Sequence, residues 1–243
     1  MPKSLTPKLV AELIGTFAFV FIGAGAAAVL GGTGLSGIAA IAFAHGLTIM
    51  VFAFAYGSIS GGHMNPAVTI GVLAAGAIRL GDALGYIIAQ LVGGIAGALL
   101  LLAVLGNAAN GLGTPQLAQG LVLGATTVTI TSPAGFVIEA VLAFFLVTAV
   151  LSTAVAGRAG NLAPLAIGMT LTLNIIMGGA LTGAAFNPAR ALGPMVATGN
   201  FTGVWLYMTA PVVGAVIAAF FHLGLTRLVG ERMIAHLAAT PAE

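Results

Sequence analysis

The sequence predicts an all-α membrane protein, in which six transmembrane helices and two half-helices form an inverted repeat of two three-helix halves. Composition is the first observation, because 60% of the 243 residues are hydrophobic and only 5% are charged, against about 25% charged residues in a soluble domain. The second is a series of apolar runs long enough to cross a membrane. The third is the triplet Asn65-Pro66-Ala67, which returns as Asn187-Pro188-Ala189 at the matching point of a similar second half.

The six spans follow one another along the chain. We expect them at about Leu9–Leu30, Gly37–Tyr56, Asp82–Leu105, Pro133–Val155, Ala163–Gly179 and Gly203–Leu228. The first run is too long for the core of a signal peptide and is interpreted as a retained span. The chain, 1–243, then forms one transmembrane domain, with repeat one at about 8–105, a connecting loop at about 106–132, repeat two at about 133–228 and a short tail at 229–243.

The two halves match at several points. Glu12 recurs as Glu139, and the segment that begins at Gln90 resembles the segment that begins at Pro211. Three spans per half is an odd number, so the second half must enter the membrane from the opposite face. That arrangement is the inverted repeat of many transport proteins, whose functional site lies at the midplane where the repeats meet.

Each Asn-Pro-Ala triplet predicts the start of a short helix. Asn caps a helix, and proline fits the first helical position because its missing N–H is not needed there. The runs that follow, Pro66–Ala77 and Pro188–Thr198, would span roughly 16–18 Å each, about half of a ~30 Å hydrocarbon core. Non-helical backbone at that depth is tolerated only where it lines a cavity or is buried in protein. The sequence therefore predicts a membrane pore lined by two broken segments.

The basic residues predict the orientation. Apart from Arg190, they lie in the N-terminus, in the loops after the second and fourth spans, or near the end of the chain: Lys3, Lys8, Arg79, Arg158, Arg227 and Arg232. With six spans these regions share one face, which the positive-inside rule makes cytoplasmic. We expect a multi-pass protein of the cell membrane, surrounded by lipid, with both termini in the cytoplasm.

The motifs also carry a resemblance to a known family. The matching segments are Ser60–Thr69 (SGGHMNPAVT), Phe186–Arg190 (FNPAR) and Glu12 in AELIGTFAFVF. One Asn-Pro-Ala triplet alone is most often the capped start of a surface helix, whereas two copies at matching points are specific. Over about residues 8–228 the chain resembles the aquaporins, or major intrinsic proteins. The resemblance implies a passive channel for water and small neutral solutes, with one pore in each subunit of a homotetramer.

Asn65, Asn187 and Arg190 are the leading pore residues. If the half-helices meet, both N-termini point at the pore centre, each with about half an elementary positive charge. A water held by both Asn amides cannot accept a proton from the next water, and the positive field opposes cations. A buried cation in a membrane is costly, which makes Arg190 a functional candidate rather than a snorkelling or salt-bridged residue. In the family the matching Arg stands at the outer constriction.

The other constriction positions follow from the resemblance. They are His45, Ile175 and Ala184, which with Arg190 resemble the filter of plant tonoplast-type members more than that of strictly water-selective bacterial ones. Ile175 stands where strict water channels have His, so an apolar wall replaces a polar group. We therefore expect the pore to pass some ammonia as well as water. The alternative for His45 is a packed core histidine.

Glu12 and Glu139 are the carboxylates deep in the spans. The family implies a structural role, in which each accepts hydrogen bonds from the irregular loop of its half and fixes the carbonyls that line the pore. Those carbonyls belong to Gly61, Gly62, His63, Gly183, Ala184 and Ala185. The alternative is a proton relay, which would imply a proton-coupled transporter that uses a pH gradient to concentrate its substrate.

The sequence leaves three further alternatives to a water channel: a facilitator for glycerol or small solutes, an anion channel and an enzyme. A glycerol or small-solute facilitator of this family usually has Asp after the filter Arg and a Pro-Leu pair in the sixth span, where this chain has Ala191 and Tyr207-Met208. An anion channel could use Arg190 and the two positive helix ends, and would carry current. An enzyme is the weakest candidate, because the four His and five acidic residues show no metal-ligand spacing and no nucleophile–base pair, and there is no cysteine. We expect no metal, no cofactor and no nucleic-acid partner.

Overall fold

The computed structural model describes residues 5–239, and only the backbone of residues 32, 33 and 230–239. Within this part of the chain, six helical segments are long and apolar enough to cross a membrane: Leu5–Leu30, Gly34–Ser60, Leu80–Leu105, Ser132–Val155, Gly160–Thr182 and Val204–Val229. They confirm the predicted fold class and the six predicted spans, with boundaries that differ by a few residues.

The first half contains three spans and one half-helix. The first span consists of α1 (Leu5–Ala18), the π-helical segment η1 (Phe19–Ala24) and α2 (Gly25–Leu30). The 3-10 segment η2 (Gly31–Gly37) leads into the second span, α3 (Ile38–Ser60). The half-helix α4 (Pro66–Ala74) and the third span, α5 (Leu80–Leu105), follow. The half-helix ends three residues before its predicted end at Ala77, because Gly76 turns out of the helix with φ of +74°.

The second half repeats this order. The fourth span is α6 (Ser132–Ala149) with the π-helical segment η4 (Val150–Val155), and the fifth is α7 (Ala163–Thr182) after the 3-10 turn η5 (Gly160–Leu162). The half-helix α8 (Pro188–Thr198) precedes the sixth span, α9 (Val204–Ala239). The segment predicted as a tail, which begins at residue 229, is helical as far as Ala239 because α9 continues to that point. Residues 240–243 and Lys3 lie outside the described residues, as does the side chain of Arg232.

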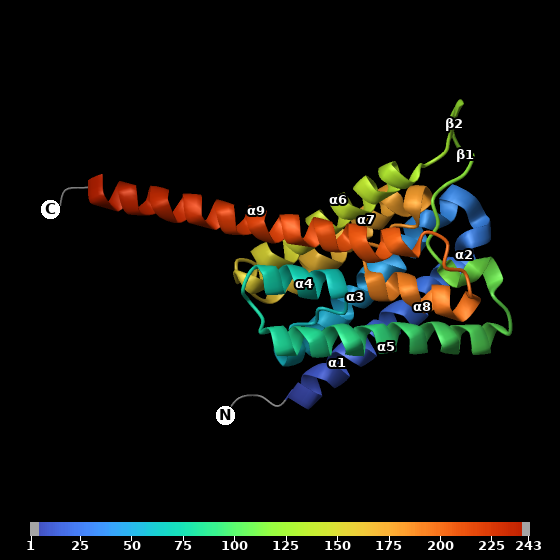
Figure 1. The fold of residues 1–243 in the computed structure, drawn as a ribbon, viewed down its shortest axis with the longest axis horizontal. Coiled ribbons are helices and arrows are strands. Elements are labelled where there is room, and N and C mark those ends of the chain that lie inside the picture. The colour runs from blue at the N-terminus through green and yellow to red at the C-terminus, as the bar shows by residue number, and fades with distance from the viewer. Residues whose placement is uncertain (1–4, 240–243) are drawn as a thin grey trace.

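The connection between the halves is folded. It contains the 3-10 segment η3 (Ala109–Gly113) and two antiparallel strands, β1 (Leu121–Leu123) and β2 (Thr126–Val128). This hairpin projects from the end of the molecule opposite to the start of α1 (Figure 1).

The half-helices α4 and α8 lie end to end inside the bundle (Figure 1). Around them, α3 of the first half packs closely on α7 of the second. Glycines permit that approach, since a Cβ added to Gly46 would lie 2.6 Å from the carbonyl oxygen of Gly168, and one added to Gly168 would lie 2.6 Å from that of Gly46. Small residues allow helix backbones to approach in this way in lipid. The contact between α3 and α7 therefore fixes one half against the other.

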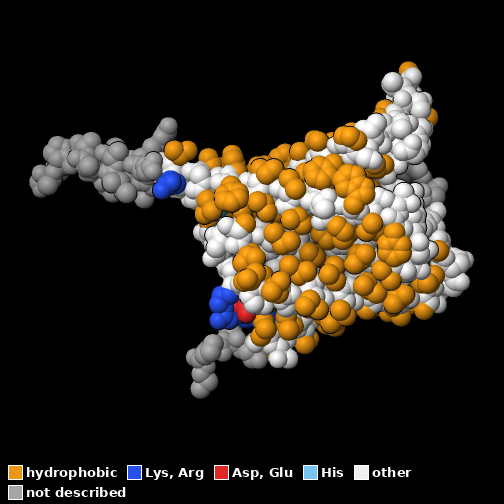
Figure 2. Space-filling model, viewed as in Figure 1, with side chains coloured by type: hydrophobic (Ala, Val, Ile, Leu, Met, Phe, Trp, Pro, Cys, Tyr) orange, Lys and Arg blue, Asp and Glu red, His pale blue; other side chains and the backbone are white. Residues whose placement is uncertain are grey.

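Apolar side chains cover the flank of the bundle in Figure 2. Ile88, Val104 and Phe220 are 64–65% exposed, and a surface of this kind suits hydrocarbon better than water. The basic side chains visible in Figure 2 lie at one end of the molecule, where α1 begins and α9 leaves the bundle. This grouping agrees with the predicted distribution of positive charge.

Candidate functional site

Both half-helices begin as their sequences predict. Asn65 and Asn187 are extended, with φ of −158° and −148°, and each precedes a proline at the first helical position. The Oδ1 atom of Asn65 accepts a hydrogen bond from the backbone N–H of Ala67 at 2.8 Å. Oδ1 of Asn187 accepts from the N–H groups of Ala189 at 3.0 Å and Arg190 at 3.2 Å. The side-chain oxygens therefore cap the helices, which leaves the amide groups free to act elsewhere.

The two Asn amides bind across the junction. Nδ2 of Asn65 donates to the carbonyl oxygen of Phe186 at 3.1 Å, and Nδ2 of Asn187 donates to that of Met64 at 2.9 Å. Each bond joins one half of the chain to the loop of the other, so the helix N-termini are held face to face. An amide nitrogen carries two hydrogens, so each Asn amide has a second hydrogen besides the one in the bond across the junction. The sequence indicated the free donor but not the bond across the junction.

Glu12 holds the loop of the first half. Its Oε1 accepts from the hydroxyl of Ser60 at 2.6 Å and the backbone N–H of His63 at 2.9 Å. Its Oε2 accepts from the N–H of Met64 at 2.6 Å and from Nε2 of Gln90 at 2.7 Å. All four partners are donors, which is the environment an acceptor-only carboxylate requires. The carboxylate lies in the first span, the loop follows the second and Gln90 lies in the third, so this cluster also joins three spans.

Glu139 makes three of the four equivalent bonds in the second half, where Pro211 stands at the position that matches Gln90. Its Oε1 accepts from the hydroxyl of Thr182 at 2.6 Å and the N–H of Ala185 at 3.0 Å, and its Oε2 accepts from the N–H of Phe186 at 2.5 Å. Both glutamates are fully buried. Each glutamate, from its own helix, thus accepts hydrogen bonds from the loop of its own half.

A tyrosine supports the same loop in each half. The hydroxyl of Tyr86 donates to the carbonyl oxygen of Ser60 at 2.7 Å, and that of Tyr207 donates to Thr182 at the same distance. None of these two tyrosines and two hydroxyl residues was predicted from the sequence to support a loop. The internal repeat could have revealed them, because Ser60 and Thr182 occupy equivalent positions just before the loops, and Tyr86 and Tyr207 equivalent positions in the spans that follow.

Arg190 is buried at the start of α8, with 3% of its surface exposed. Its Nε donates to Nε2 of His45 at 3.4 Å, and its Nη1 donates to the carbonyl oxygen of Gly113 at 2.8 Å. The Nδ1 atom of His45 lies 2.9 Å from the carbonyl oxygen of Ile41. A carbonyl can only accept, so Nδ1 carries the proton and Nε2 is free to accept from Arg190. The structure therefore brings together two predicted filter residues and adds Gly113, which the sequence analysis did not identify.

The other two predicted filter residues are buried as well. Ile175 and Ala184 belong to the main apolar cluster of the bundle, which also contains Phe19. The ring of Phe19 meets that of His45 edge-on, with 5.3 Å between the ring centres. His45 can approach the first span because Gly23 has no side chain, since a Cβ there would lie 2.5 Å from Cδ2 of His45.

The loops before the half-helices use left-handed backbone. Positive φ angles occur at Gly61, Gly62 and Met64 in the first loop and at Gly183, Ala184 and Phe186 in the second. Such angles are uncommon for residues other than glycine. The N–H groups next to them are bound by the glutamates and by the hydroxyls of Ser60 and Thr182. Those bonds hold the loops in this left-handed conformation.

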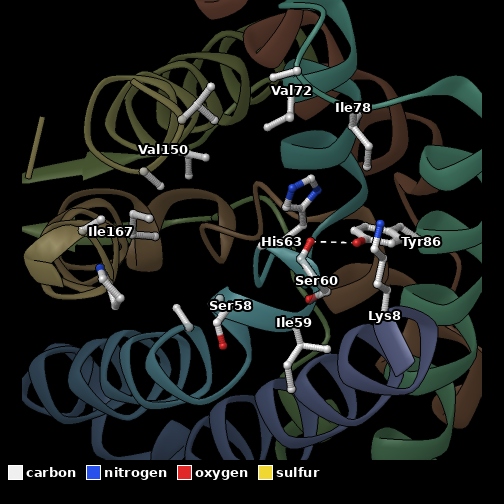
Figure 3. Close-up of a pocket in the computed structure, with 18 of the residues that line it drawn as sticks. Lys8, Ser58, Ile59, Ser60, His63, Val72, Ile78, Tyr86, Val150 and Ile167 are labelled. Carbon is white, nitrogen blue, oxygen red and sulfur yellow. Dashed lines mark hydrogen bonds between the residues drawn. The ribbon is translucent and has the colours of Figure 1, made fainter. Parts of the chain in front are cut away.

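A cavity of about 1040 Å³ lies at the end of the molecule where α1 begins. Figure 3 shows His63 and Tyr86 on its wall, together with Ser60, whose carbonyl oxygen accepts from Tyr86. Nδ1 of His63 lies 3.1 Å from Oγ1 of Thr69, and its ring packs edge-on against Tyr86. His63 is thus held in place on the wall of the cavity. Among the described residues, no group of three or more His, Cys, Asp and Glu could hold a metal ion.

Comparisons with known proteins found related sequences and a related fold. A family model described as "Major intrinsic protein" matches residues 2–222. The chain is 40% identical over 225 residues to aquaporin TIP4-4 of Zea mays, with 89% of this chain and 85% of that protein covered. It is 41% identical over 222 residues to probable aquaporin TIP1-2 of Oryza sativa subsp. japonica, with 88% and 84% covered. The X-ray structure of the aquaglyceroporin from Plasmodium falciparum covers 90% of this chain and 96% of its own, with a TM-score of 0.75 at 26% identity.

Proposed function

This chain belongs to the major intrinsic protein family and is a passive channel for water, and we propose that its pore excludes protons and ions and also passes ammonia. The observation that carries the proposal is the junction of α4 and α8. Two helix N-termini face each other inside the bundle, each with a buried Asn amide at its tip.

The junction supplies the chemistry for proton exclusion. Each N-terminus carries a partial positive charge of about half an elementary unit, and the pore-facing N–H groups of Asn65 and Asn187 donate to a passing oxygen. A water that accepts from both has its lone pairs occupied and cannot receive a proton from its neighbour. The positive potential also raises the energy of hydronium and metal cations at the same point.

Arg190, His45, Ile175 and Ala184 form the outer filter in this proposal. Arg190 adds a full positive charge and donors for a solute oxygen, while its Nε is occupied by His45. Ile175 presents an apolar wall where a histidine would offer another hydrogen bond. A filter with fewer polar groups lowers the cost of replacing water by ammonia, because fewer protein groups are left unpaired when a weaker hydrogen-bonding solute passes.

The carbonyls of Gly61, Gly62 and His63 and of Gly183, Ala184 and Ala185 form the acceptor ladder of the pore in the same proposal. It is supported by the position of the neighbouring N–H groups, which bond to the protein on the glutamate side of each loop. Glu12 and Glu139 are then structural. Glu12 accepts four hydrogen bonds and Glu139 three from donors of their own halves, and these donors occupy most of the positions at which a relay would accept a proton.

The assembly and orientation are part of the proposal. We propose a homotetramer in the cell membrane with both termini in the cytoplasm. The orientation is supported by the basic side chains gathered at one end of the molecule (Figure 2). A groove of about 720 Å³ between α6 and α7 is lined by apolar side chains, among them Val141, Phe145 and Leu173. It offers a surface for a helix of a second copy. Cross-linking in native membranes tests the assembly, and protease protection of a C-terminal tag tests the orientation.

Stopped-flow light scattering on proteoliposomes tests the function, with paired osmotic and ammonium-gradient jumps and a pH-sensitive dye inside the vesicles. We expect fast water flux, an ammonia response above that of protein-free vesicles, and no proton leak. An ammonia permeability equal to that of protein-free vesicles would rule out the proposal that the pore passes ammonia. A proton leak or an electrical current would favour an ion channel. Concentration of a solute under a pH gradient would favour a proton-coupled transporter. A glycerol jump in the same vesicles tests the facilitator alternative.

A further inference from the structure

The connection between the halves contains a turn of left-handed helix. Asn110, Gly111 and Leu112 have φ and ψ near +50° and +30°, and Gly113 continues with φ of +68°. Left-handed conformation is ordinary for glycine and accessible to Asn, but for a residue such as Leu it is strained. Consecutive left-handed residues persist only where the surrounding structure holds them.

Two side chains hold this turn against the outer end of the first span. Leu112 has no exposed surface and packs in a buried cluster with Ala28 and Leu101. Nδ2 of Asn110 donates to the carbonyl oxygen of Ala28 at 2.6 Å. Leu112 thus anchors the turn by burial and Asn110 by a hydrogen bond, both to the same segment, α2.

The anchored turn delivers one atom to the filter. Gly113 directly follows Leu112, and its carbonyl oxygen accepts from Nη1 of Arg190 at 2.8 Å. Gly113 lies so close to the first span that an added Cβ would be 2.9 Å from the carbonyl oxygen of Ala24. The carbonyl therefore has little freedom while Leu112 stays in its pocket.

We propose that Leu112 and Asn110 are positioning residues for Arg190, acting through the carbonyl of Gly113, and that they set the largest solute the pore admits. The inference rests on the proposed role of Arg190 in the outer filter. When the turn detaches, Arg190 loses the acceptor on Nη1 and keeps only His45. Its guanidinium then occupies a wider range of positions, and the opening is on average larger and less polar.

The ratio of glycerol to water permeability in proteoliposomes tests this proposal. Arg190→Ala is the reference, and we expect it to raise the ratio about fivefold. Leu112→Ala should raise the ratio about threefold. Asn110→Gly should raise it about twofold, because glycine adopts the left-handed turn but has no side-chain amide to donate. Leu112→Met keeps the volume of the anchor and should leave the ratio near that of the unmodified protein. Leu123→Ala is the matched control, because Leu123 lies in β1 of the same connection and is exposed.

A double variant separates positioning from general destabilisation. If Leu112 acts through Arg190, Leu112→Ala should add nothing to the ratio once Arg190→Ala is present. An equal further rise in that background, or a rise in Leu123→Ala, would overturn the proposal, as would an unchanged ratio in folded Leu112→Ala. If Leu112→Ala fails to insert, Asn110→Gly gives the same decision. An unchanged ratio in Arg190→Ala would instead overturn the filter role on which the inference depends.

Discussion

Replacing Glu12 by glutamine should weaken the loop before the first half-helix, although the side chain keeps its shape. The carboxylate accepts four hydrogen bonds, two on each oxygen. Glutamine replaces one oxygen by an NH₂ group, which only donates. If that group takes the Oε2 position, the N–H of Met64 faces another donor. If it takes the Oε1 position, the N–H of His63 does.

The magnitude follows from these donors. Gln90 can turn its own amide, so the smallest loss in Glu12→Gln is one buried backbone N–H without an acceptor, which costs about 1–3 kcal/mol. The remaining bonds lose their charge assistance, which is worth about as much again. We therefore expect the free energy of unfolding to fall by about 3 kcal/mol, and the midpoint of thermal unfolding by roughly 6–12 °C for a chain of this size.

Thermal unfolding in detergent, together with water permeability per inserted channel, checks this prediction. Asp82→Asn is the matched control, since Asp82 is a carboxylate with ion-pair distances of 3.5 Å to Lys8 and 3.1 Å to Arg79 near the surface. Surface ion pairs contribute under about 1 kcal/mol, so its midpoint should move little. Equal midpoints for Glu12→Gln and the unmodified protein would refute the argument that the carboxylate stabilises the loop.

Three further perturbations test other parts of the structure. Tyr207→Phe removes a 2.7 Å hydrogen bond to the carbonyl of Thr182 and should lower the free energy of unfolding by about 1 kcal/mol, measured by the same thermal scan. Gly46→Leu should abolish the monodisperse peak in size-exclusion chromatography, because a side chain there meets the backbone of α7, whereas Gly224→Leu, with open space around it, should not. Asn187→Asp keeps the capping oxygen but removes the donor to the opposite loop and adds negative charge at the junction. It should admit sodium ions to proteoliposomes that exclude them with the unmodified protein, and continued exclusion would argue against the electrostatic role of the junction.

The parts of this molecule that the sequence predicts are those governed by local chemistry. Span length follows from hydropathy, and the half-helices follow from an Asn cap with proline after it, so both are visible in short segments. The acceptor for Arg190 is of a different kind. It is a backbone carbonyl, at a separation of 77 residues, and any residue type carries such a group. Only the path of the connection between the halves brings Gly113 to the filter, and no pattern in that uncharged connection indicates its path.

The two halves differ in the residues that follow the Asn-Pro-Ala triplets. Both contribute a glutamate, a hydroxyl residue, a tyrosine and a capped half-helix, so the centre of the pore is nearly symmetric. After the triplets, the first half has Val68, which is buried in the main apolar cluster, and the second has Arg190. In the proposed channel, a charge at only one end lets the Arg190 end discriminate between solutes, while the other end holds a cavity of about 1040 Å³. The long connection then has a reason to fold over the outer end, because a single buried guanidinium needs acceptors that the symmetric frame does not contain.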